Sequence, residues 1–173
     1  MSEDQALDAL QHAFDDAFMR PLAGPRTPDV ALVAFDLGED RFALPLQELV
    51  GVYELPTTVP LPGAPGALMG LAGLRGQLVP VYVLAALLGT PRPKEPPRWI
   101  VVYGRTEPVA LAFHVLRGHL DVAPAAIRPL ASRPLAGTFV RAVVRMADGP
   151  PLALLDLAAL DAVIRPPSEE RPQ

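Results

Sequence analysis

The stretch GLAGLRGQLVPV at residues 70–81 decides the fold, because a single polar turn interrupts two otherwise apolar segments. Both segments have the composition of short strands, and Arg75-Gly76 between them predicts the turn. Glycine at the second turn position permits the positive φ that such a turn needs. The residues that follow, VLAALL (83–88), predict a short helix, and Gly89 is suited to cap its C-terminus. The order strand, turn, strand, helix is therefore the first structural prediction.

The same order recurs about 70 residues later in the chain. GQLVPVYVLAALL (76–88) and GPPLALLDLAALD (149–161) superpose without a gap, and this alignment places Val83 on Asp156. We expect a duplicated β-unit, each copy ending in a strand and a short helix. An aspartate before a helix can accept a hydrogen bond from its first turn, whereas a valine cannot. Only the second helix is therefore expected to have a side-chain cap.

Short apolar segments separated by turns also fill the rest of the chain between residues 30 and 163. Such segments at this spacing indicate an all-β fold of small barrels or sandwiches. Two small barrels that pair would bury more apolar surface than either could alone. The predicted strands are 30–37, 41–46, 51–55, 68–74, 77–82, 99–104, 108–113, a segment around 115–120, 139–146 and 151–155.

The predicted organisation has three parts. Residues 1–29 form an N-terminal amphipathic helix with a Pro-rich linker, 30–163 form the β-domain, and 164–173 form a disordered tail. Within the β-domain, the two halves cover about 30–89 and 98–163. The N-terminal helix is expected because large apolar residues recur at spacings of three and four. This stripe packs either on the protein's own body or on a partner; it consists of Leu7, Leu10, Phe14 and Phe18.

Composition excludes several classes of protein. Nineteen acidic residues against 15 basic ones give a net charge of −4, which argues against a general nucleic-acid binder. The chain has no cysteine, and therefore no disulfide, thiolate metal site or thiol nucleophile. No apolar run approaches the roughly 18 residues of a membrane span. The N-terminus is acidic and lacks a secretory pattern, so a soluble cytoplasmic protein without membrane insertion is expected.

The residues of common enzyme sites are also missing. His114 and His119 flank a predicted strand at a spacing that would point them to opposite faces, which does not suit a metal site. Glycines 70, 73 and 76 are followed by a strand instead of a helix, so they do not form a phosphate-binding loop. We therefore expect no enzyme activity, no metal and no cofactor.

Arg75 is the strongest candidate for binding a partner, because burial does not explain an arginine within an almost wholly apolar stretch. An arginine with fixed geometry makes forked hydrogen bonds to carbonyl or carboxylate groups. From the residues alone, a partner-binding site and a plain solvated turn both stay open.

Three stretches of the chain resemble the CheW-like domain family. They are FDLGEDRFALPL (35–46), PGAPGALMGLAGLRGQLVPV (62–81) and ALLDLAAL (153–160), and the resemblance extends over about 30–163. It implies two intertwined, five-stranded, SH3-like β-barrels with a hydrophobic groove between them. It also implies a non-enzymatic adaptor or scaffold that couples chemoreceptors to a CheA-type histidine kinase in a chemosensory two-component pathway.

The resemblance also implies partners and site residues. The partners are the regulatory domain of the CheA-type kinase and the cytoplasmic tip of a methyl-accepting chemoreceptor; self-association is a further expectation. Such an adaptor would lie in the cytoplasm at membrane-associated receptor arrays. For the apolar positions among the implied site residues, ordinary barrel core is the alternative interpretation. The implied partner-binding residues are Leu49, Gly70, Leu74, Arg75, Gly76 and Leu116.

The chain departs from the family pattern at a few positions. The family usually has Asn where this chain has Gly73, and Asp where it has Val83. In the second half it commonly has Gly at the position of Ala110, and Val-Asp where this chain has Phe113-His114. One alternative is therefore a divergent structural or localisation protein that has lost kinase coupling. Another is a sensor that binds a small ligand in the groove between the barrels.

Overall fold

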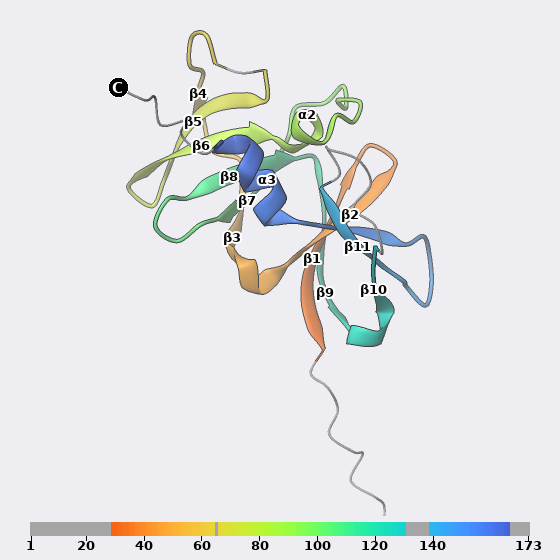
Figure 1. Cartoon of the computed structure of the whole chain (residues 1–173). Coiled ribbons are helices and arrows are strands. Elements are labelled where there is room, and N and C mark those ends of the chain that lie inside the picture. Colours follow the sequence, from red (N-terminus) through yellow and green to blue (C-terminus); the bar gives the residue numbers. More distant parts are fainter. Residues whose placement is uncertain (1–28, 65, 131–138, 167–173) are drawn as a thin grey trace, which may run out of the picture.

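The computed structural model describes residues 29–64, 66–130 and 139–166, which form two six-stranded sheets (Figure 1). We call them sheet A, with strand order β10-β11-β12-β2-β1-β9, and sheet B, with strand order β3-β7-β8-β6-β5-β4. The predicted N-terminal helix with its linker lies outside the described residues, as do 167–173 of the predicted tail. The prediction of an all-β fold with short helices is confirmed.

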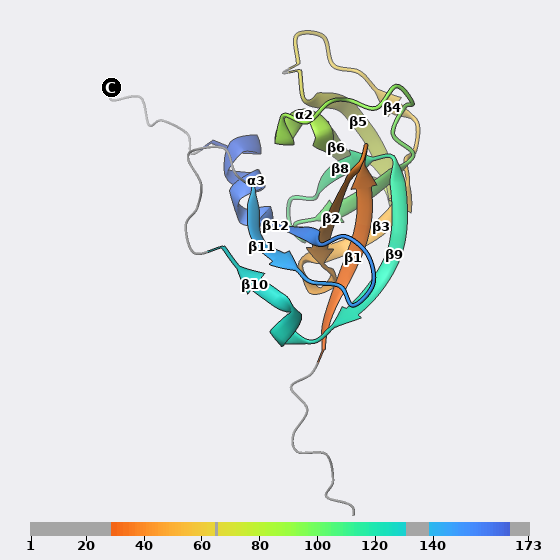
Figure 2. The same cartoon turned by 90° about the vertical axis from the view of Figure 1, so that its right-hand side faces the viewer.

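Sheet A combines strands from both ends of the domain. Figure 2 shows its long edge strand β9 running beside β1, with which it pairs in antiparallel fashion. Its strands are β1 (Val30–Leu37), β2 (Asp40–Pro45), β9 (Val115–Val122), β10 (Ile127–Pro129), β11 (Val140–Val144) and β12 (Leu152–Leu155).

Sheet B is built from the middle of the chain. Its strands are β3 (Leu49–Glu54), β4 (Thr58–Val59), β5 (Leu68–Leu74), β6 (Gln77–Val83), β7 (Trp99–Tyr103) and β8 (Val109–Phe113). The helix α2 (Leu84–Leu88) follows β6, and the helix α3 (Leu157–Ile164) follows β12. Two 3₁₀ turns, Leu46–Glu48 and Pro124–Ala126, precede β3 and β10.

The two sheets have the same architecture, shifted by six strands along the chain. In sheet A the order β9-β1-β2-β12-β11-β10 corresponds strand for strand to β3-β7-β8-β6-β5-β4 in sheet B. The parallel pair β12 with β2 matches the parallel pair β6 with β8. Each repeat has therefore contributed its first hairpin to the sheet of the other repeat. The predicted halves, about 30–89 and 98–163, are sequence repeats but not separate sheets.

Three apolar cores hold this arrangement together. One lies against sheet A and contains Leu32 and Ala34, and a second lies against sheet B and contains Ile100 and Ala110. The third joins both sheets and both helices, and in it the rings of Phe35 and Phe113 lie 4.7 Å apart between centroids. Because successive residues of a strand point to opposite faces, β1, β7 and β8 serve two cores at once.

The two helices end and begin as the sequence predicts. Gly89, at φ 68°, forms the left-handed C-cap of α2. The side chain of Asp156 accepts a hydrogen bond of 3.1 Å from the backbone N–H of Ala159 at the start of α3. Val83, at the equivalent position before α2, makes no side-chain cap. The expected difference between the two helix starts is therefore confirmed.

Some details of the sequence prediction need correction. Each sheet has six strands instead of five, because the short strands β4 and β10 form within segments where no strand is predicted from the sequence. Closure of each sheet into a barrel stays a prediction, since the strand order in each has two ends. Ile164 is the last residue of α3 and does not belong to a disordered tail, because it packs on the central core.

Candidate functional site

The predicted turn between β5 and β6 is a two-residue hairpin loop. Leu74 and Gln77 pair across it, and Arg75 and Gly76 have φ values of 49° and 79°. Positive φ at both loop residues matches the right-handed twist of the flanking strands. Within the described chain, Arg75 is the only residue other than glycine with positive φ. The predicted turn and the positive φ of Gly76 are confirmed.

The side chain of Arg75 is exposed and has one recorded contact. Its guanidinium carbon lies 5.3 Å from the centre of the Tyr53 ring, a distance typical of a cation–π interaction. Among the residues that the structure describes, no carboxylate forms an ion pair with it. Tyr53 lies on β3, and Arg75 lies in the turn that follows β5. Three other strands separate β3 from β5 in sheet B, so sheet B must curl to bring the two residues together.

Gly70, a predicted site residue on β5, has a clear structural reason to be glycine. It is buried at φ +148°, and a Cβ atom there would lie 2.2 Å from the backbone oxygen of Val59. A side chain would therefore separate β5 from β4, with which it pairs. Leu74, at the end of β5, is half-buried and packs against the core of sheet B.

The other two predicted site residues lie away from the arginine turn. Leu49, the first residue of β3, is buried in the central core. Leu116 belongs to β9, the equivalent strand of the second repeat, and packs against the same core. It also lines an open groove of about 730 Å³. The structure thus brings four of the predicted residues together on one hairpin and leaves Leu49 and Leu116 at the contact between the sheets.

The groove beside Leu116 has mixed chemistry. Trp99 lines it, and His114 forms a contact of 2.5 Å between its Nε2 and the backbone carbonyl of Glu95. Arg98 and Glu54 form an ion pair of 3.7 Å at its wall, with both side chains largely exposed. His114 thus links the end of β8 to the segment that leads into β7, at one of the positions where the chain departs from the family pattern.

In sheet A, an ion pair joins the edge strand β9 to its neighbour β1. Arg117 on β9 donates from Nε to Asp36 on β1 at 2.7 Å, and the side chain of Asp36 is almost fully buried. The hydrogen bond and the charge of Asp36 raise the pKa of Arg117 above its ordinary value. This pair ties the edge strand to its neighbour through Nε and Nη2 of Arg117, whereas Arg75 has no carboxylate partner among the described residues.

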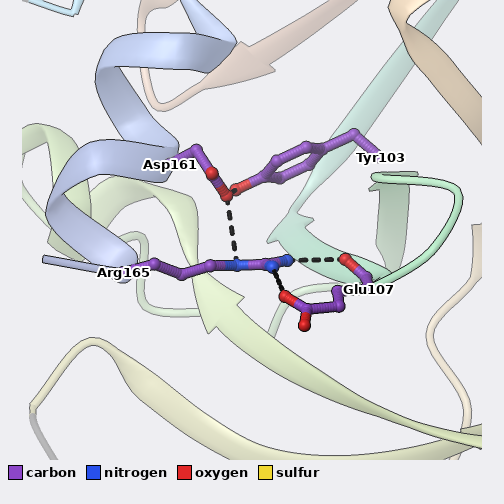
Figure 3. Close-up of polar contacts among 4 residues, drawn as sticks. All are labelled: Tyr103, Glu107, Asp161 and Arg165. Atoms are coloured by element: carbon purple, nitrogen blue, oxygen red, sulfur yellow. Dashed lines mark hydrogen bonds and ion pairs between the residues drawn. The ribbon is translucent and has the colours of Figure 1, made fainter. Parts of the chain in front are cut away.

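A polar cluster fastens α3 to the β7–β8 turn (Figure 3). The Tyr103 hydroxyl donates a hydrogen bond of 3.0 Å to Asp161 Oδ1, and Arg165 Nε lies 3.3 Å from the same oxygen. Arg165 also pairs with the carboxylate of Glu107 and donates to its backbone carbonyl at 2.5 Å. Burial, followed by the charge and hydrogen bond of Asp161, raises the pKa of Tyr103. Sequence reasoning missed this cluster.

An apolar surface lies beside the arginine turn and was also missed by sequence reasoning. Leu78, close to the turn on β6, is 72% exposed, and Val163 on α3 is 56% exposed. Leu78, Pro80 and Ile164 line a shallow hollow of about 350 Å³. Period-two alternation indicates which residues of β6 face away from the core, but only the packed structure shows that α3 leaves this face open.

The described part of the chain contains neither a metal-binding cluster nor a membrane-spanning helix. No three His, Asp or Glu side chains are placed to hold a metal ion. No helix of the described residues has the length and apolar character needed to cross a membrane.

Two sheets that exchange hairpins and share a central core define an all-β protein, and the Arg75 turn projects from one of these sheets. The family follows from comparison with known proteins. The model of the CheW-like domain matches residues 31–163, and the chain therefore belongs to this family. The resemblance found in the sequence is confirmed.

Relatives and a solved structure agree with this assignment. The chain is 26% identical to the chemotaxis protein CheW of Rhizobium meliloti (strain 1021) over 142 residues, which cover 81% of this chain and 89% of the relative. It is 30% identical to protein FrzA of Myxococcus xanthus over 87 residues, or 50% of this chain and 54% of that protein. The scaffolding protein TtCheW from Thermoanaerobacter tengcongensis has a similar fold, with a TM-score of 0.66 at 19% identity; the match covers 73% of this chain and 88% of that one.

Proposed function

We propose that this protein is a non-enzymatic adaptor that couples chemoreceptors to a CheA-type histidine kinase in a chemosensory two-component pathway. The observation that carries this proposal is the family match over residues 31–163, which includes all six predicted partner-binding residues. Relatives named as chemotaxis proteins support the same pathway. The adaptor acts by position: it holds a receptor and a kinase domain side by side.

Two surfaces are available for two partners. The Arg75 turn offers an exposed guanidinium without a carboxylate partner in the described chain, which suits a polar contact on the regulatory domain of the kinase. The groove beside Leu116, which Trp99 and Val115 also line, offers partly apolar surface to the helical tip of a receptor, whereas Leu49 supports it from the buried core. Because the central core joins both sheets, a partner on one surface is held at a fixed distance from the other.

Reconstitution tests this function. The full chain is mixed with the CheA-type kinase and a receptor cytoplasmic fragment from the same genome, and autophosphorylation of the kinase is measured with and without the chain. We expect the chain to co-sediment with both partners and to increase receptor-dependent kinase activity. The variant Arg75→Ala should weaken binding to the kinase without unfolding the chain.

The outcomes separate the proposed function from its alternative. If the chain binds neither partner and does not change kinase activity, the adaptor function is wrong. If it binds a receptor or itself but never the kinase, it is a divergent structural or localisation protein. Departures such as Gly73 and Val83 would then have removed the kinase contact.

A further inference from the structure

The backbone at Arg75 is unusual for a residue with a side chain. An L-residue at φ 49° has its Cβ close to the following carbonyl, which is why glycine and asparagine dominate such positions. Nothing lies within 4 Å of the Cβ that could be added at the neighbouring Gly76, so the turn itself is open to solvent. The backbone at Arg75 therefore favours glycine, so a reason for the arginine side chain is sought in its contacts.

A surface on β3 lies directly beneath this side chain. The Tyr53 ring faces the Arg75 guanidinium at 5.3 Å and is itself half-buried against the core of sheet B. Space for the ring comes from Gly51, two residues earlier on the same face of β3. A Cβ atom at Gly51 would lie 2.5 Å from the Tyr53 hydroxyl oxygen and 2.7 Å from the adjacent ring carbon.

Apart from its contact with Tyr53, the Arg75 guanidinium forms no hydrogen bond or ion pair with the described residues. A guanidinium over an aromatic ring interacts through its face, while its N–H groups point outward in its own plane. Four other arginines of the described chain pair with acids: Arg98 with Glu54, Arg117 with Asp36, Arg141 with Glu48 and Arg165 with Glu107. Arg75 shares the lack of an ion pair with other described arginines, such as Arg105 and Arg145, but only Arg75 combines it with a position over an aromatic ring. Arg75 has no such partner among the described residues, so its charge is available to an acidic group from outside.

We propose that Tyr53 is a positioning residue for partner binding: its ring, seated over Gly51, holds the Arg75 guanidinium so that its N–H edge meets a carboxylate of the partner. The inference rests on the proposed function, because the partner is taken to be the kinase regulatory domain. Tyr53 makes no contact with the partner itself; it lowers the number of orientations that Arg75 must give up on binding.

The experiment compares four single variants of the full chain: Tyr53→Leu, Tyr53→Phe, Gly51→Ala and Arg75→Ala. Titration calorimetry with the kinase regulatory domain measures the dissociation constant of each. Arg75→Ala should weaken binding tenfold or more. Tyr53→Leu should weaken it by roughly three- to fivefold, the range of an exposed cation–π contact. Tyr53→Phe keeps the ring and should bind within about twofold of wild type, whereas Gly51→Ala displaces the ring and should behave like Tyr53→Leu.

A second measurement reports the same contact without any partner. The Nε–H signal of Arg75 in an ¹⁵N-labelled chain should be shifted by the ring and should move to a random-coil position in Tyr53→Leu. An unchanged signal in that variant overturns the inference. Thermal melting of every variant checks that the fold is retained. If Tyr53→Leu or Gly51→Ala fails to fold, the Arg75 Nε–H signal of the wild-type chain decides, because a signal already at the random-coil position overturns the inference.

The outcomes for the inference and for the proposed function differ. If Arg75→Ala loses binding and Tyr53→Leu binds like wild type, the inference is wrong and the adaptor function stands. If the wild-type chain does not bind the kinase domain, the proposed function fails, and the Arg75 signal alone decides whether Tyr53 holds the arginine. The double variant Tyr53→Leu/Arg75→Ala should bind no more weakly than Arg75→Ala alone, because Tyr53 acts only through Arg75. Additive losses would overturn the proposal.

Discussion

The units β5–β6–α2 and β11–β12–α3 are copies of one element, yet they have different properties. The first has a two-residue turn that carries Arg75, followed by a five-residue helix without a side-chain cap. The second has a longer turn around Gly149, followed by an eight-residue helix that Asp156 caps. Asp161 and Arg165 fasten this second helix to the opposite sheet. The first copy carries a single charge, on Arg75, which is unpaired among the described residues, while the second copy uses Asp161 and Arg165 to join the sheets.

This difference has a physical reason. Charges satisfied inside the protein stabilise it but give a partner little to bind, whereas an unpaired charge is available for binding and contributes little to stability. A duplicated fold can separate the two roles because the central core joins both copies. We therefore expect substitutions in the second unit to act mainly on stability and substitutions at the first turn to act mainly on binding.

The largest difference between the copies should appear at the equivalent leucines of the two helices. Leu160 is fully buried in the central core, whereas Leu87, its counterpart on α2, is only partly buried against that core. Leu160→Ala should lower the free energy of unfolding by about 2–5 kcal/mol, the range for a buried leucine. Leu87→Ala should cost about 1–2 kcal/mol, since less surface returns to water. Urea denaturation of both variants measures this; equal losses would contradict the comparison.

A smaller effect is expected where α3 is fastened to β7. Tyr103→Phe removes a hydrogen bond to a carboxylate and should cost about 1–2 kcal/mol at neutral pH, since Asp161 is partly exposed. The raised pKa of Tyr103 also predicts a pH effect. Above about pH 10 the unfolded tyrosine loses its proton while the folded one keeps it, so stability falls as the pH rises.

The phenylalanine variant should lack this part of the alkaline loss. Stability is measured by urea denaturation between pH 8 and pH 11 for wild type and Tyr103→Phe. Tyr82→Phe serves as the control, because no hydrogen bond to the Tyr82 hydroxyl is recorded among the described residues. Parallel stability curves for wild type and Tyr103→Phe above pH 10 would show that the hydroxyl does not couple folding to its proton.

Exchange of the helix caps should give a still smaller effect. Asp156→Ala removes the side-chain acceptor at the start of α3 and should cost typically about 1 kcal/mol. Val83→Asp offers α2 the missing cap, and the backbone at Val83 is extended, as it is at Asp156. Its gain should be reduced by the loss of a half-buried valine, leaving stability nearly unchanged. Thermal melting decides; a large loss in Val83→Asp would show that packing, not capping, governs this position.

Most elements of the fold could be predicted from the sequence because their signals are local. A nearly continuous apolar run that ends at a polar turn indicates a strand such as Val30–Leu37, and Asp156 and Gly89 mark helix ends by their own chemistry. The exchange of hairpins between the sheets could not be predicted, because periodicity does not indicate which strand a given strand will pair with. The short strands β4 and β10 were missed because prolines beside or within them signal loops, and pairing with β5 and β11 overrides that signal.

The candidate site was predicted only in part. The Arg75-Gly76 turn has a sequence signature, and the structure confirms its geometry. Tyr53 was missed because its proximity to Arg75 arises from the curl of sheet B and not from any spacing in the chain. Gly70 matches the family motif, and its close packing against β4 is sufficient to explain why this position needs glycine. Whether Leu49, Gly70, Leu74, Arg75, Gly76 and Leu116 contact a partner stays a prediction.

The smallest effect on stability, and the clearest contrast between the copies, is expected at Arg75. Its side chain is exposed, and the strain of its left-handed backbone offsets the stabilisation from its contact with Tyr53. Arg75→Ala should therefore change the free energy of unfolding by no more than about 0.5 kcal/mol. Arg75→Gly, which suits the positive φ better, should be slightly more stable than Arg75→Ala, by up to about 1 kcal/mol.

The effect of the same substitutions on kinase binding should be large. Both Arg75→Ala and Arg75→Gly should weaken kinase binding tenfold or more, because removing one member of a buried charged pair costs roughly 2–5 kcal/mol and each 1.4 kcal/mol is a factor of ten. Arg75→Lys should restore binding only in part, since an ammonium group lacks the planar fork. Melting and binding are measured on the same preparations. A variant that is as stable as wild type and binds poorly supports a turn kept for binding, whereas an unfolded Arg75→Ala would mean that the first copy, like the second, uses its charge to hold the fold.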